Sequence, residues 1–357
     1  MTSNKIIDET EINDIRQIKD FKIISFSNYK KSEVKIKIIN ELKNGKIESV
    51  CYWAAELICA GHYYDLWDII IFFVSKYIHI GNPKIIIYLE KRFVIFKNII
   101  DQGFFVSIMD LRNNQTIRNL FAEIICVLSL SNKKNSFETI KINKIEEFNI
   151  SQLSEIVKAQ NIYIQDFFKK KDPKEFFIAL NEFAFSISKE KHDIATACYW
   201  IEWIIEFNNL CISQKKPCLC EKREYEVEKK YKNDVIWIIW DILLYESNKC
   251  NNFISTIIKS ILFFFCIKYT TASSKKKKYL FYFAIELIIQ NEKIPENVEL
   301  ITEKNVLKNV LDKINYIYQE IKKNEIDPGT DYLFNGIKKN DNNFEKSIEK
   351  MEIMNSF

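Results

Sequence analysis

The segment 49–71, SVCYWAAELICAGHYYDLWDIII, holds the densest group of side chains that could do chemistry. His62, Asp65 and Asp68 are spaced three residues apart on one helical face, and Glu56 lies a turn or two upstream. Imidazole and carboxylate groups arranged in this way would serve as metal ligands or as a general acid and base. Strong zinc motifs, however, carry two histidines four residues apart around a general base, and this segment has one histidine. The pattern therefore favours a structural use, in which His62 and Asp65 cap the helix and Asp68 bonds a Trp or a backbone group.

A second candidate site is a group of three cysteines, Cys211, Cys218 and Cys220, in the segment CISQKKPCLCEKR. With Cys250 or His192 as a fourth ligand, these thiolates would make a zinc site. The spacing C-x6-C-x-C matches no common zinc finger, so an ordinary loop with buried or free thiols is the favoured interpretation. We accordingly expect no metal and no cofactor. The chain has nine cysteines, an odd number without a disulfide-framework spacing, which indicates a reducing compartment.

Two basic stretches suggest contact with nucleic acid. In the first, at 223–232, Arg223 and three lysines surround Tyr225 and Tyr231, a composition typical of single-strand binding surfaces. Glutamates are interleaved with these residues, so a solvated face is favoured. The second stretch, Lys275 to Lys278, is interpreted as a short solvated connector. Phosphate-binding glycine loops and nucleophile elbows do not occur in the sequence, and its three histidines form no nucleophile arrangement, so we predict that the protein is not an enzyme.

Composition indicates that helices position these residues. Hydrophobic residues make up 47% of the 357 residues, whereas six Gly and five Pro are too few for the frequent turns of an all-β fold. Apolar residues recur with the helical period from residue 31 onward, and Asp172 is expected to cap one helix, with Glu175 completing a capping box. The predicted helices cover about 31–43, 47–60, 63–78, 83–100, 115–130, 172–184, 193–212, 233–247, 250–270, 277–291 and 302–323.

Two aromatic motifs occur twice along the chain. Cys51-Tyr52-Trp53 returns as Cys198-Tyr199-Trp200, an offset of 147 residues, and Trp67-Asp68 returns as Trp240-Asp241, an offset of 173 residues. The difference of 26 residues predicts an insertion at about 208–233. All six Trp lie in these two regions: Trp53, Trp67, Trp200, Trp203, Trp237 and Trp240. We interpret the repeat as a duplicated helical unit whose Trp and Tyr are packing anchors, each with its polar tip bonded to a neighbouring Asp or Glu.

These observations predict an all-α protein of two related multi-helix halves with polar N- and C-terminal tails. Residues 1–30 would form a polar lead-in, 31–130 the first half, 131–150 a connector, 151–323 the second half with its insertion, and 324–357 the polar tail. The net charge of +4 is too weak and too dispersed for a dedicated nucleic-acid binder. The polar, acidic start predicts no signal peptide, and no apolar run reaches the roughly 18 residues of a membrane span, so we expect a soluble protein.

The stretches CYWAAELICAGHYYDLWDIIIFFVSKYIHIGNPKIIIYLEKR (51–92) and YKNDVIWIIWDILL (231–244) carry a resemblance to a known group of proteins. The chain resembles a poorly characterised helical family of nucleocytoplasmic large DNA viruses of protists and algae, over most of residues 31–270. The matching residues are Trp53, Glu56, Gly61, His62, Trp67, Asp68, Ser75, Lys76, Ile78, His79, Gly81, Asn82, Pro83, Asp234, Ile236, Trp237 and Trp240. None of these motifs identifies a chemistry.

The resemblance implies a virus-encoded helical protein made in the host cytoplasm, in the virus factory, and carried into the virion as a minor structural component. The leading hypothesis is a non-enzymatic scaffold whose partners are other viral capsid or assembly proteins. The alternative is an accessory subunit of viral DNA replication or transcription, with weak nucleic-acid contact through the 215–232 insertion and the 275–278 lysines. A metal-dependent enzyme at His62, Asp65 and Asp68 is the least favoured interpretation.

Overall fold

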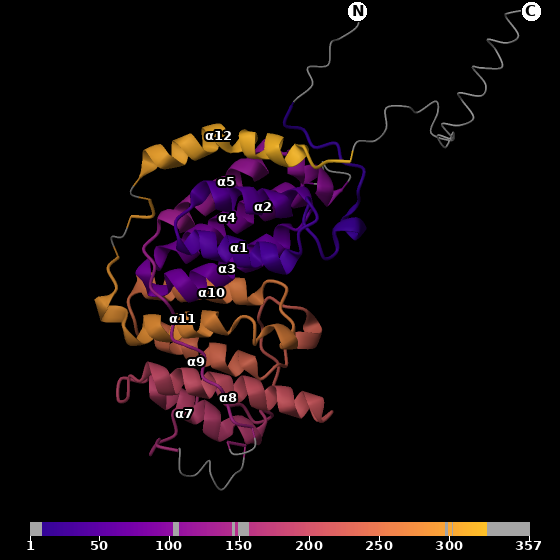
Figure 1. Cartoon of the computed structure of the whole chain (residues 1–357). Helices are drawn as coiled ribbons and strands as arrows, with labels where there is room; N and C mark the ends of the chain where they lie inside the picture. The colour runs from indigo at the N-terminus through magenta and orange to yellow at the C-terminus, as the bar shows by residue number, and fades with distance from the viewer. Residues whose placement is uncertain are drawn as a thin grey trace, which may run out of the picture.

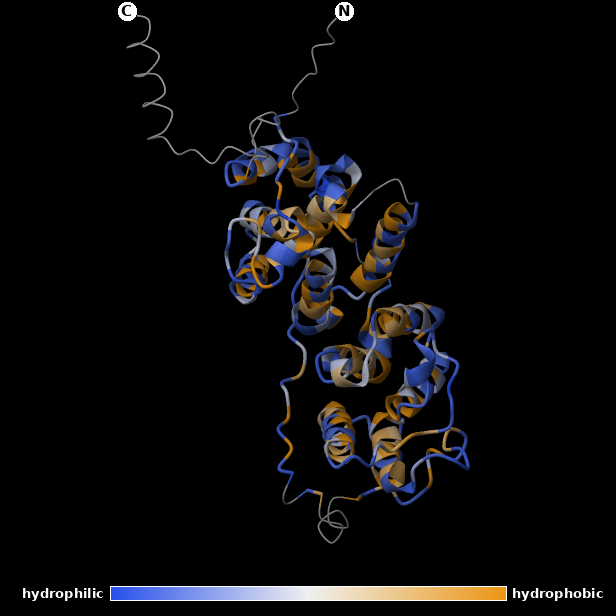
Figure 2. Cartoon of the chain, turned by 90° about the vertical axis from the view of Figure 1, so that its right-hand side faces the viewer, coloured by the Kyte–Doolittle hydropathy of each residue, from blue (hydrophilic) through white to orange (hydrophobic). Residues whose placement is uncertain are grey.

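The computed structural model describes residues 9–102, 107–144, 147–148, 157–296, 299–301 and 303–326. Within these ranges all regular structure is helical, which confirms the all-α prediction. Figure 1 shows the helices stacked in an elongated column, and Figure 2, which views many of them nearly end-on, shows their hydrophobic faces turned toward one another. The predicted tail from residue 327 onward, the first eight residues and the start of the second half at 151–156 lie outside the described residues.

The first half contains α1 (Lys31–Lys43), α2 (Ile47–Cys59), α3 (Tyr63–Phe73), α4 (Lys84–Asp101) and α5 (Gln115–Leu130). Gly45 and Gly61 end α1 and α2 with φ of 70° and 77°, a backbone conformation that glycine adopts without strain. These tight turns fold α1 back on α2 and α2 back on α3, and α5 then packs against α2.

The second half contains α7 (Phe177–Ile187), α8 (Ile194–Ser213), α9 (Ile236–Asn248), α10 (Asn252–Cys266) and α11 (Lys278–Ile289). Several of its helix pairs correspond to pairs in the first half. α7 packs on α8 as α1 packs on α2, α8 packs on α11 as α2 packs on α5, and α10 packs on α11 as α4 packs on α5. The extended segment 131–142 runs from one half to the other (Figure 1).

The last helix, α12 (Lys304–Lys322), returns to the first half, where it packs on α2 and α5. The sequence analysis assigned it to the second half. Its buried residues Ile314, Tyr318 and Ile321 form one apolar stripe, which can be stable in water only against another helix. The Arg118 guanidinium of α5 lies 4.0 Å from the centre of the Tyr318 ring and helps to hold α12 there.

The described part of the N-terminal segment, 9–30, also belongs to the first half. Ile12, Phe21 and Phe26 are fully buried, and the Arg16 guanidinium lies 4.7 Å and 4.8 Å from the two phenyl ring centres. The expected polar lead-in is therefore, from residue 9 onward, a folded strap with a short 3-10 helix at Ile18–Phe21. Sequence periodicity missed it because a strap without regular structure has no repeat to detect.

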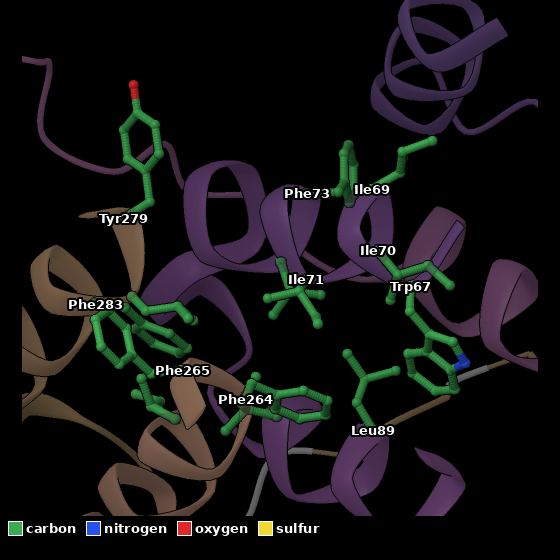
Figure 3. Close-up of a cluster of buried hydrophobic side chains, with 14 of the residues drawn as sticks. Trp67, Ile69, Ile70, Ile71, Phe73, Leu89, Phe264, Phe265, Tyr279 and Phe283 are labelled. Carbon is green, nitrogen blue, oxygen red and sulfur yellow. The ribbon is translucent and has the colours of Figure 1, made fainter. Parts of the chain in front are cut away.

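The two halves meet through an aromatic cluster. Figure 3 shows side chains of α3, α4, α10 and α11 converging, among them Trp67 and Phe264. The rings of these two residues are stacked with centres 6.5 Å apart, and Phe264 also lies 6.0 Å from Phe93. Such a cluster removes large apolar areas from water and therefore joins the halves into one core.

A second contact between the halves follows α3. The chain continues as a π-helical turn (Val74–Ile78) and a 3-10 turn (His79–Gly81), both packed on α11, rather than as one helix to residue 78. His79 has φ of 49° and is fully buried with its ring 4.9 Å from Phe283. Its Nδ1 lies 3.3 Å from Oε2 of Glu286, but neither ring nitrogen forms a hydrogen bond with the described residues.

Candidate functional site

Glu56 is buried in the first half, where it links the N-terminal segment to α2. Its carboxylate accepts hydrogen bonds from Ser25 Oγ at 2.6 Å, Ser27 N at 2.8 Å and Ser27 Oγ at 2.5 Å. Three donors satisfy a charge that would otherwise be costly to bury. Glu56 thus holds the N-terminal strap on α2, and its oxygens are occupied rather than free for catalysis.

His62 and Asp65 have a related role. Nε2 of His62 lies 2.7 Å from the Phe21 carbonyl oxygen and 3.0 Å from that of Ile24, and its Nδ1 lies 3.5 Å from Asp65. Asp65 also accepts from Lys31 Nζ at 2.7 Å. The prediction that these side chains cap α3 is wrong, because no side-chain cap bond forms there. They tie the strap and α1 to α3 instead.

The Trp residues are mainly core anchors. Trp67, Trp200, Trp237 and Trp240 are fully buried, whereas Trp53 is half-buried between Tyr29 and Tyr52. The Nε1 atoms of Trp67, Trp200 and Trp240 have no hydrogen-bond partner among the described residues, so the expected acidic acceptors are missing there. The other two buried indoles donate to backbone carbonyls, Trp203 to Glu147 and Trp237 to Tyr231.

The cysteines of the insertion do not assemble a metal site. Within the described part of the chain, no three His, Cys, Asp or Glu side chains are placed to hold a metal ion. Cys220 is buried and its Sγ donates to the Asp234 carbonyl oxygen at 3.2 Å, while Cys218 is only half-buried. The candidates Cys211, Cys218 and Cys220 are therefore not gathered with Cys250 or His192.

Arg223 was predicted to lie on a solvated face. It is buried and connects the insertion to the rest of the second half. Its guanidinium donates to both oxygens of Asp172 at 2.9 Å and 2.7 Å, and to Asp241 at 2.9 Å. Asp241 also accepts from the Tyr225 hydroxyl at 2.6 Å. Asp172 was predicted to be a helix cap, but α7 begins only at Phe177 and the carboxylate of Asp172 is the buried partner of Arg223. One signal was available, since Arg223 is the only arginine after Arg118 in a lysine-rich chain.

The feature best suited to binding is a cleft between the halves, with a volume of about 620 Å³. α1, α2 and α3 line it from the first half, and the α10–α11 connection with the start of α11 lines it from the second. We call it the lysine cleft, after Lys31, Lys35, Lys268, Lys275, Lys276 and Lys277. Asp65 and Asp68 are its acidic residues. The structure thereby joins two features that lie about 200 residues apart in the sequence, the carboxylates of α3 and the lysine run.

Several of these lysines are held in place by neighbouring groups. Lys277 donates to the carbonyl oxygens of Phe264, Phe265 and Ile267 at the end of α10, and Lys275 pairs with Glu206 at 2.5 Å. Burial lowers the pKa of Lys277 to about 8, against the opposing effect of the Asp68 carboxylate. The prediction of a solvated connector is therefore wrong for Lys277 and also for Lys278, which is buried and pairs with Glu202 at 2.7 Å.

The other charged residues of the lysine cleft form fewer contacts with neighbouring groups. Lys35 and Lys276 have no carboxylate partner among the described residues, and Lys268 places its Nζ 3.2 Å from the centre of the Tyr64 ring. Asp68 was expected to bond a Trp or a backbone group, but its side chain is accessible at the cleft. Surrounding protein partly excludes water and raises the pKa of this carboxyl, while Lys277, Lys268 and Lys35 act in the opposite direction. The cleft as a whole presents an excess of positive charge.

In comparisons with known proteins, no family model matches the chain, and neither curated proteins nor solved structures show significant similarity to it. Among the described helices, each is too short or too polar to serve as a membrane span.

Proposed function

We propose that this chain is a non-enzymatic interaction protein of a large DNA virus, a helical scaffold that binds other viral proteins during capsid or virion assembly. The proposal rests on the structural roles of the residues in its sequence motifs. Glu56, His62 and Asp241 each bind another segment of this chain, and Trp67 and Trp240 fill its core. Residues committed to architecture in this way suit a protein that acts through its surface. The viral origin rests on the resemblance over residues 31–270, and the site of action would be the virus factory and the virion.

We further infer that the two halves arose by duplication. The corresponding helix pairs support this, and so do the surroundings of the repeated Trp. Trp67 contacts Phe96 of α4 and Phe121 of α5 at 5.8 Å and 5.7 Å. Trp240 contacts Phe265 of α10 and Phe281 of α11 at 5.2 Å and 5.1 Å. A duplicated unit stacked on itself gives a long array of helix faces, as in other scaffold architectures.

Quantitative proteomics of purified virions, combined with cross-linking, tests the scaffold function. We expect the protein in virions at a constant ratio to capsid components, with cross-links that map to exposed helix faces. Absence from virions together with expression early in infection would contradict the scaffold function and favour the alternative.

That alternative is an accessory subunit of viral DNA replication or transcription, and the observation in its favour is the exposed Lys276 at the lysine cleft. With few lysines available for phosphates, binding to single-stranded DNA should be weak, independent of sequence, and lost as salt rises from about 50 to 200 mM. Tight binding that persists at physiological salt would rank this function above the scaffold.

A further inference from the structure

We propose that the lysine cleft is a binding site for a nucleotide-type small molecule, whose phosphates contact the lysines and whose ring lies on the apolar floor. The inference goes beyond the scaffold function and does not depend on it. Six lysines and two aspartates line the cleft, so the positive charges are in excess and an anion is the favoured ligand. The volume of about 620 Å³ lies within the range of small-ligand pockets, roughly 300–1,000 Å³.

Some lysines of the cleft are held in fixed positions before a ligand binds, and others can move. Lys277 already donates to three carbonyl oxygens, Lys31 is paired with Asp65 and Lys275 with Glu206, so these lysines contribute to the positive field of the cleft rather than bonding the anion directly. Lys35 and Lys276 have no carboxylate partner among the described residues and can turn toward phosphate oxygens. The cationic side of the site is thus partly preorganised and partly adaptable.

The floor of the cleft supplies the other half of the recognition. Phe72 is its partly accessible ring, and Leu57, Ile69 and Leu280, which come from both halves, lie almost fully buried behind it. An apolar surface beside a cluster of lysines matches a ligand that has a flat ring at one end and phosphates at the other. The Asp68 carboxylate is part of the same lining and would repel a phosphate placed beside it.

Calorimetric titration at about 50 mM and 200 mM salt, with three probes, tests the proposal. The probes are adenosine triphosphate, inorganic triphosphate and a single DNA strand of ten nucleotides. We expect the nucleotide to bind most tightly, because only it uses both the lysines and the floor. Equal affinity for inorganic triphosphate would overturn the assignment of the ring. Tighter binding of the DNA strand would overturn the small-molecule site, and no binding of the nucleotide would overturn the proposal altogether.

Substitutions test whether the nucleotide binds at the lysine cleft. The double variant Lys35→Ala/Lys276→Ala should weaken nucleotide binding at least about tenfold, since each removes one charged contact. The matched control is Lys170→Ala/Lys171→Ala, which removes the same charge from two exposed lysines outside the cleft and should leave affinity within about twofold. Asp68→Asn should strengthen binding, because it removes a repulsive carboxylate. All five positions are exposed, and a thermal melt of each variant verifies folding. An equal loss in the control, or weaker binding by Asp68→Asn, contradicts the site.

Discussion

At the scale of single residues, buried charges hold together segments that are distant in the sequence. Arg223 joins the insertion to Asp172 before α7 and to Asp241 on α9. Each oxygen of Asp172 accepts one guanidinium nitrogen, and a planar fork of this kind cannot be reproduced by a single ammonium group. Arg223 is therefore the residue that links the insertion to two separate elements of the second half at once.

Replacement of Arg223 by Lys should lower the free energy of unfolding by about 3 kcal/mol, because the buried Asp172 loses its two-pronged partner and Asp241 loses one of its donors. The matched control is Arg92→Lys, where the arginine and its partner Glu123 are partly exposed, with an expected cost below about 1 kcal/mol. Urea denaturation of both variants measures the difference. Equal costs for the two variants would mean that the Arg223 network contributes little.

His79 predicts a dependence of stability on pH. Burial lowers the pKa of this imidazole to about 3, and Lys134 acts in the same direction. Because the unfolded chain binds a proton near pH 6.5 and the folded chain does not, stability should fall as the pH decreases from about 6.5, by about 2 kcal/mol at pH 4.5. Burial raises the pKa of the neighbouring Glu286, which opposes this trend, so variants that retain Glu286 are compared.

The measurement is the slope of unfolding free energy against pH between 6.5 and 4.5. His79→Asn should flatten the slope, since asparagine tolerates positive φ and does not titrate. His192→Asn, at an exposed histidine with φ of 46°, should leave the slope unchanged. An unchanged slope in His79→Asn would show that this imidazole is not the source of the pH dependence.

What the sequence reveals at this scale depends on whether a residue's partner is nearby. Trp67 and Trp240 lie in apolar helical stripes, and their burial follows from spacing alone. The partners of Glu56 lie about 30 residues away and those of Arg223 up to 56 residues away, most of them in segments without regular structure. Local patterns carry no information about such pairs, so the lysine cleft was also not foreseen as one site.

At the scale of helices, the repeated Trp should behave as equivalent anchors. Trp67→Ala and Trp240→Ala should each cost about 3–5 kcal/mol, the range for a large buried aromatic side chain. Trp53→Ala should cost only about 1–2 kcal/mol, because that ring is half-buried. Thermal melts of the three variants give the ranking. If Trp67→Ala or Trp240→Ala proved stable but lost partner binding, these aromatic faces would be an interface rather than core.

The docking of α12 makes a separate prediction about thiol reactivity. Tyr318 of α12 lies near Cys51 and Cys59 of α2, whose pKa values burial raises to about 12. Protonated, buried thiols react slowly with iodoacetamide at pH 8. Tyr318→Ala should loosen α12 and speed alkylation of Cys59 about tenfold or more through local opening.

Two internal controls accompany this labelling. Cys198, in the second half, should remain protected in Tyr318→Ala, and Tyr316→Ala should change nothing, since Tyr316 is 65% exposed. Faster labelling of all three cysteines would indicate global unfolding rather than release of α12. The helical period of α12 predicts its apolar stripe, but a stripe does not specify its partner, so the contact of α12 with α2 and α5 does not follow from the sequence pattern.

At the scale of the whole molecule, the two halves are not independent stretches of chain. The segment 131–142 leads from the first half to the second, and α12 closes back onto the first. At the boundary between the halves, the ring of Phe264 on α10 packs against the rings of Trp67 on α3 and Phe93 on α4. A large apolar interface makes independent motion of the halves unfavourable, and it keeps the two walls of the lysine cleft at a fixed separation.

The protein should therefore unfold in one cooperative transition, with equal calorimetric and van't Hoff enthalpies. Phe264→Ala leaves a cavity at the boundary and should separate this into two transitions, because each half keeps its own core. The matched control is Phe253→Ala, a half-buried phenylalanine about three turns earlier on α10, which should lower the melting temperature slightly and retain one transition. Two transitions in the unmodified protein would show that the boundary cluster couples the halves only weakly. In that case the lysine cleft, whose walls come from both halves, would have no fixed geometry with which to select a ligand.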